Sequence, residues 1–235
     1  MSRPVRLVAL CIGRAGDEQQ RWHPAHVQAL LRPSPVGVPP AQRLTLGDFW
    51  ADCTDGELDL TPSVALDWVE PPAAQAVWSA LNSPEIVGAA DAVLLDTVQQ
   101  LVDTCLPSLS PSDLSALHTA HGVVILTTAE SPLYWTQPIS LGADRRTFAA
   151  YLSTGCSHTS MAHEIGHLLE LQHSFGLPTV GVGTEYGNPY CIMSARRFGG
   201  RSRQVMHRVE DPPLLPDAPL WDQRECPVSY THLTL

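Results

Sequence analysis

The sequence predicts an α/β fold with one main unit followed by an irregular C-terminal part. Two short apolar runs, Val5 to Ile12 and Gly122 to Thr127, have the length and composition of buried strands, whereas Asp91 to Cys105 repeats its apolar residues at helical spacing. Of the 235 residues, 44% are hydrophobic and 16% are charged, which is typical of a globular protein and not of a disordered chain. We therefore expect strands and helices packed around a common core.

Other segments fill in the order of elements along the chain. The proline-rich stretch from Arg32 to Pro40 is expected to be a loop, and Phe49 to Glu70 to be strand material with turns at Asp55-Gly56 and Thr61-Pro62. Thr147 to Leu152 is apolar and aromatic, so we expect a strand there, just before a helix that carries the most specific motif of the chain.

That motif begins at His163 and reads His-Glu-Ile-Gly-His. In an α-helix, His163 and His167 project from one face a single turn apart, so both imidazoles can bind one metal ion. Glu164 lies beside them, where it can act on a metal-activated water. This HExxH spacing indicates a zinc peptidase in which the glutamate is the general base.

Catalytic zinc usually has three protein ligands, and the run continues to a third histidine, His173. On an unbroken helix its ring would face away from the metal, so the helix must stop near Glu170 if His173 is a ligand. Here the chain resembles the metzincin clan of zinc peptidases, whose pattern is HExxHxxGxxH. The family has a glycine in a left-handed turn where this chain has Glu170, and a non-glycine residue there costs on the order of 1 kcal/mol.

A second stretch extends the resemblance. Cys191 to Ser194 follows a Gly-Asn-Pro turn and is similar to the Met-turn of gametolysin-like and immune-inhibitor-A-like peptidases. By that resemblance, Met193 forms an apolar floor beneath the three imidazoles. A disulfide bridge between Cys156 and Cys191 would join the two halves of such a site, but the pairing of the six cysteines cannot be read from the sequence.

The resemblance implies a metzincin-like twisted mixed sheet with packed helices, a zinc helix at the floor of the cleft, and a small irregular C-terminal subdomain. It divides the chain into an N-terminal catalytic subdomain, residues 1–173, and a subdomain with the Met-turn, residues 174–227. The last residues, 228–235, read VSYTHLTL, which is similar to the translation of a sequencing adaptor, so we expect them to be foreign to the natural protein.

The expected function is that of a zinc-dependent endopeptidase with one catalytic Zn²⁺. Its substrate would be a polypeptide in extended form, paired with the strand at residues 147–152, which is the edge strand in metzincin-like folds. Peptidases of this kind are commonly exported, so an extracellular location is expected by resemblance, although the N-terminus is not a convincing signal peptide. Neither the oligomeric state nor the cleavage specificity follows from the sequence.

Three alternatives stay open on the sequence. Glu185, 18 residues after His167, has the spacing of a glutamate ligand in other zinc peptidases, although the Tyr-Gly-Asn-Pro after it favours a turn. Instead of a peptidase, the protein could be a zinc-containing binding module without catalytic activity. The zinc could also be purely structural, in a site with four protein ligands that includes Glu185 or His158.

Charge and hydropathy exclude other classes of partner. The net charge of -10 argues against nucleic acid and anionic membrane surfaces, because both call for clustered lysine and arginine. No stretch approaches the roughly 18 apolar residues that a membrane-spanning helix needs.

Overall fold

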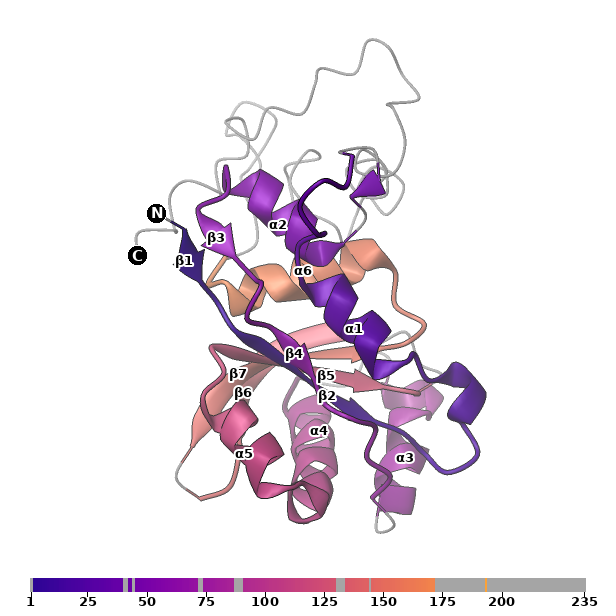
Figure 1. Ribbon diagram of the computed structural model, residues 1–235. Coiled ribbons are helices and arrows are strands. Elements are labelled where there is room, and N and C mark those ends of the chain that lie inside the picture. Colours follow the sequence, from indigo (N-terminus) through magenta and orange to yellow (C-terminus); the bar gives the residue numbers. More distant parts are fainter. Residues whose placement is uncertain are drawn as a thin grey trace, which may run out of the picture. The chain divides into compact units, whose positions relative to one another are not determined.

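A computed structural model describes the chain at residues 2–39, 42–43, 45–71, 74–86, 91–129, 134–143, 145–171 and 193 (Figure 1). Within these residues the protein is of mixed α/β type, with a five-stranded mixed sheet and a two-stranded parallel sheet. The chain forms two compact units. Unit 1 comprises Met1–Val5, Ala29–Thr61 and Ser157–Leu235, and unit 2 comprises Arg6–Gln28 and Pro62–Cys156.

Unit 2 contains the five-stranded sheet, whose strand order is β4-β2-β5-β7-β6. The strands are β2 (Leu7–Ile12), β4 (Val64–Ala65), β5 (Gly122–Thr127), β6 (Tyr134–Ser140) and β7 (Arg146–Ser153). Strands β4, β2, β5 and β7 run parallel, and β6 pairs antiparallel with β7. Every residue of β2 and β5 is buried, as expected for central parallel strands, and this explains their uninterrupted apolar sequences.

Three helices of unit 2 cover one face of this sheet (Figure 1). They are α3 (Gln75–Leu81), α4 (Asp91–Cys105) and α5 (Pro111–His118). Their apolar side chains form one buried cluster with alternate residues of the strands, among them Leu10, Ile125 and Tyr151. The predicted helix 91–105 and strand 122–127 are therefore confirmed. The predicted strand at Val5 begins two residues later, at Leu7.

The strand at residues 147–152 is confirmed as part of β7, but the expectation that it is the edge strand is wrong. It lies between β5 and β6, and β6 is the edge. Gln137 and Pro138 interrupt the apolar pattern of β6, so the sequence does not reveal it, and an edge position tolerates the proline because its missing N–H is not needed there. A short antiparallel connection closed by the Leu141 N–H donating to the Arg145 carbonyl (2.7 Å) brings β6 alongside β7.

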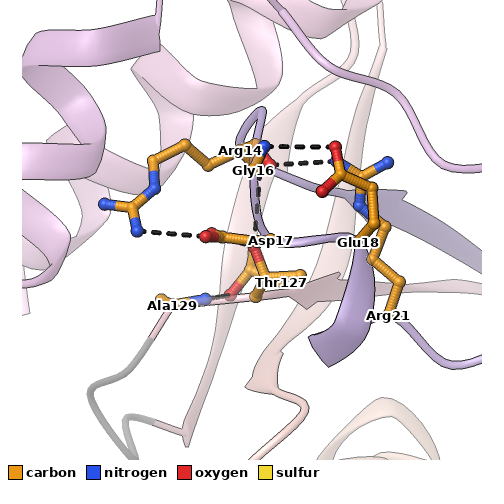
Figure 2. A network of polar contacts seen from close by, with 8 residues as sticks. Arg14, Gly16, Asp17, Glu18, Arg21, Thr127 and Ala129 are labelled. Carbon is orange, nitrogen blue, oxygen red and sulfur yellow. Dashed lines mark hydrogen bonds and ion pairs between the residues drawn. The ribbon is translucent and has the colours of Figure 1, made fainter.

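A polar network ties together the chain segments that follow β2 and β5 (Figure 2). The Asp17 carboxylate is 6% exposed; one oxygen pairs with the Arg14 guanidinium (3.0 Å), and the other accepts from the Thr128 hydroxyl (3.0 Å). Arg21 donates to the Arg14 carbonyl (2.9 Å), and the Gly16 N–H donates to Glu18 (3.2 Å). Asp17 lies in the loop after β2 and Thr128 in the loop after β5, so the hydrogen bond between them holds the two loops together.

Unit 1 contains β1 (Arg3–Pro4), α2 (Leu46–Cys53), β3 (Leu58–Asp59) and α6 (His158–Leu168), and β1 pairs parallel with β3. The remaining helices of the described residues are α1 (Pro24–Leu31) and the short 3-10 helices η1 (Glu18–Gln20), η4 (Pro84–Ile86) and η5 (Leu106–Ser108). None of the helices in the described ranges is both long and apolar enough to cross a bilayer.

The prediction of strand material from Phe49 to Glu70 is wrong for its first five residues, 49–53, which belong to α2. Thr45 and Asp48 form a capping box at the start of this helix: the Asp48 N–H donates to the Thr45 hydroxyl, and the Asp48 carboxylate accepts from the Thr45 N–H. Satisfying these two backbone groups favours a helix over the strand tendency of the aromatic residues. The turns at Asp55-Gly56 and Thr61-Pro62 and the loop at residues 32–39 are confirmed.

Candidate metal centre

The predicted HExxH segment lies on α6, which begins after Ser157. The Ser157 hydroxyl accepts a hydrogen bond from the Ser160 N–H (3.1 Å) and so satisfies one of the backbone donors at the helix start. Met161, Ile165 and Leu168 are buried at helical spacing, and this apolar side holds the helix in unit 1. The predicted helix is therefore confirmed, and its cap and its buried apolar side stabilise it.

The two histidines of the motif converge. Their Nε2 atoms are 3.2 Å apart, and their rings meet nearly at right angles, with centroids 4.8 Å apart. Two nitrogens that each bind zinc at about 2.05 Å with tetrahedral geometry are about 3.3 Å apart. The spacing of His163 and His167 therefore fits two ligands of one zinc ion, and His163 is only 4% exposed.

The Nδ1 atom of His167 faces the carbonyl oxygen of Leu171 at 2.8 Å. A carbonyl only accepts hydrogen bonds, so Nδ1 carries the proton of the neutral ring and donates it. The Nε2 atom is then left with its lone pair, which is the form that binds a metal. A backbone group thus selects the tautomer of His167 that a metal site needs.

The helix ends in a left-handed turn at Glu170, whose φ is 67°. The Glu170 N–H donates to the His167 carbonyl, and the Leu171 N–H donates to the Gly166 carbonyl, both at 3.0 Å. This pair of bonds is the Schellman arrangement, which usually requires glycine at the left-handed position. The predicted end of the helix near Glu170, with positive φ despite a side chain, is therefore confirmed.

Glu164 follows His163 directly on α6, and its side chain is buried, with 4% of its surface exposed. It is therefore a carboxyl group shielded from bulk water on the residue next to the first histidine of the motif. This is the position that the HExxH pattern requires of a general base.

Met193 is completely buried and lies against α6. A Cβ atom placed on Gly166 would be 2.5 Å from the Met193 Sδ atom, so the thioether is in contact with the helix backbone one residue before His167. Its predicted role as a floor beneath three imidazoles stays a prediction, because the third imidazole is not described. Trp50 of α2 also contacts Gly166, and the sequence offered no signal for this residue beyond its size.

The other residues named in the predicted site have different outcomes. His173, Glu185 and Cys191 lie outside the described residues, as does the segment 174–227 apart from Met193, and so do residues 228–235. Within the part that is described, no three His, Cys, Asp or Glu side chains gather at one point. His158 is the first residue of α6 and is rotated by about 140° from His163 and about 180° from His167, so the helix directs it away from the pair.

The chain matches no family model, and a search of curated proteins finds no match either. Three features of the chain itself fit a metal centre, namely the ring spacing of His163 and His167, the Leu171 carbonyl and the turn at Glu170.

Proposed function

We propose that this protein is a zinc-dependent endopeptidase of metzincin type. One observation carries the proposal: the Nε2 atoms of His163 and His167 lie 3.2 Å apart on one helix face, with Glu164 in the order of the HExxH motif. The left-handed end of α6 supports it, because this turn stops the helix before the third histidine of the metzincin pattern. A twisted mixed sheet with packed helices, which is the metzincin-like expectation, is part of the proposal.

His163 and His167 would hold the metal, together with His173 if the metzincin pattern applies. A bound Zn²⁺ in such a site acidifies water and polarises the carbonyl of the scissile peptide bond. The hydrogen bond from His167 to Leu171 would keep this ring turned toward the metal and its Nε2 atom free of a proton.

Glu164 would move the proton. Its carboxylate takes a proton from the attacking water and passes that proton to the leaving amine nitrogen. Burial serves this role, because a carboxylate away from bulk water keeps the proton within the site until the peptide bond breaks.

The proposed substrate is a polypeptide in extended form. The strand at residues 147–152 is not its pairing partner, because the main-chain groups of β7 already pair with β5 and β6.

Glu170 adopts the left-handed conformation that the metzincin pattern requires at this position, so the replacement of glycine by glutamate is no reason to favour a zinc module without activity.

The proposal is tested by metal analysis and peptide cleavage on the whole chain. We expect about one zinc ion per chain and cleavage of a peptide library that stops with a chelator and returns when zinc is added. Absence of bound zinc would refute the metal centre. Bound zinc without cleavage of any peptide would refute the peptidase and leave a zinc-binding module.

A further inference from the structure

Gly166 lies between the two metal-directed histidines, and two side chains press on it. A Cβ atom there would be 2.5 Å from the Met193 Sδ atom and 3.1 Å from the Cζ2 and Cη2 atoms of Trp50. The φ of Gly166 is not positive, so the glycine serves to make space and not to allow an unusual backbone. The six-membered ring of Trp50 therefore lies directly on the α6 backbone.

Of these two side chains, Trp50 is the rigid one. The flexible side chain of Met193 can adapt its shape, whereas the indole of Trp50 is a rigid planar ring system. Trp50 is 2% exposed and meets the Phe49 ring edge-on, with centroids 5.1 Å apart. The position of the indole is thus set by α2.

Helix α2 is itself firmly anchored. The Asp48 carboxylate accepts from the Ser34 N–H (2.8 Å) and the Ser34 hydroxyl (2.5 Å), in addition to its role in the capping box with Thr45. A Cβ on Gly47 would collide with the backbone of Arg32, so the start of α2 packs tightly against the preceding loop. Helix α2 therefore holds Trp50 in a fixed position against Gly166 of α6.

Two hydrogen bonds through Leu171 connect the backbone of Gly166 with the ring of His167. The Gly166 carbonyl accepts from the Leu171 N–H (3.0 Å), and the Leu171 carbonyl accepts from the Nδ1 atom of His167 (2.8 Å). Displacement of the backbone at Gly166 therefore moves the group that orients the His167 ring.

We propose that Trp50 is a positioning residue for His167. It holds the α6 backbone at Gly166 and, through Leu171, keeps the His167 ring in the tautomer and orientation that leave Nε2 directed at His163. The expected effect of Trp50 on metal affinity rests on the proposed function. Its expected effect on the tautomer and orientation of the His167 ring does not.

The test compares Trp50→Phe with Trp78→Phe. The first change removes the ring atoms that touch Gly166, and the second removes the same atoms from an equally buried tryptophan in the core of unit 2. Nitrogen-15 spectra of the metal-free chain report the tautomer of His167, and competition with a chelator gives the zinc dissociation constant. Cobalt(II) absorption reports the ligand geometry.

We expect Trp50→Phe to reduce the population of the Nδ1–H tautomer of His167, to weaken zinc binding by about tenfold and to alter the cobalt spectrum. Trp78→Phe should leave all three readouts as in the parent chain, even if both variants lose similar stability. Equal effects of the two variants, or an unchanged tautomer in Trp50→Phe, would overturn the inference. A parent chain that binds no zinc refutes the proposed function, while the nitrogen-15 comparison still decides the role of Trp50.

A second pair of variants covers the case in which Trp50→Phe does not fold. Gly166→Ala places a methyl group against the Met193 Sδ atom and the indole of Trp50, so the α6 backbone or these side chains must shift, whereas a Cβ on Gly155 would meet only the Ser153 hydroxyl at an ordinary 3.6 Å. Gly166→Ala should therefore shift the His167 signals and weaken zinc binding, and Gly155→Ala should do neither. The same result for both alanines would contradict the proposal.

Discussion

The Nδ1 atom of His167 lies 2.8 Å from the Leu171 carbonyl oxygen, across the left-handed turn that ends α6. The same turn thus ends the helix and orients the ring of His167. A turn centred on Glu170 brings the carbonyl of Leu171 back over the last helical residues, where His167 can donate to it.

Replacement of Glu164 by glutamine should separate metal binding from chemistry. Glutamine keeps the shape of the side chain but cannot take a proton, so we expect kcat to fall by about 10²- to 10⁴-fold with the zinc content unchanged. Steady-state kinetics and elemental analysis measure the two effects. Glu57→Gln, at an exposed position just after the turn at residues 54–56, is the control and should retain full activity. Equal loss in both variants would argue against Glu164 as the base.

Zinc content should identify the third ligand. We expect His173→Ala to lose most of the bound metal, because two imidazoles alone hold zinc weakly, and Glu185→Ala to keep it. His158→Ala is the matched control on the same helix as the histidine pair, since α6 turns this residue away from them. Loss of zinc in Glu185→Ala with retention in His173→Ala would assign the ligand to the glutamate.

Glycine at position 170 should stabilise the protein. Glu170 has φ of 67°, and a side chain in this region costs about 1 kcal/mol, so Glu170→Gly should raise the free energy of unfolding by about that amount. Urea unfolding measures the change. Glu170→Ala is the control, because it removes the carboxylate from the helix end but keeps the Cβ atom. If alanine stabilises as much as glycine, the charge near the helix terminus is the cause and not the backbone.

Stability should decline in alkaline solution because of Cys11. Burial, reinforced by the negative charge of Asp67, raises the pKa of this thiol from 9.0 to about 12. Both states hold the proton below pH 9, so stability is complete there. Above it, the unfolded chain releases a proton that the folded chain keeps, and stability falls until the folded thiol ionises near pH 12.

Between pH 8 and pH 10, this thiol should lower the free energy of unfolding by about 1 kcal/mol, as urea titrations at the two values can measure. Burial also raises the pKa of Cys105 to about 12, so this thiol adds a similar decline. Cys11→Ala should remove about half of the combined loss, and the double variant with Cys105→Ala most of it. An unchanged pH dependence in the double variant would contradict this account.

The sequence by itself determined the elements whose signals are local. The apolar period of residues 91–105, the unbroken apolar run at 122–127 and the HExxH spacing are each patterns within a few residues, and the two helices and the strand that they predict are confirmed. The turn at Glu170 was predicted on the condition that His173 is a ligand, because an unbroken helix would turn the His173 ring away from the other two.

Only the tertiary structure decided the relations between distant segments. The place of β7 inside the sheet depends on β6 pairing with it, and no property of residues 147–152 reveals that neighbour. The contact of Trp50 and Met193 with Gly166 joins three separate stretches of the chain. Such contacts depend on shape and packing across the fold, which a local pattern of residue types does not encode.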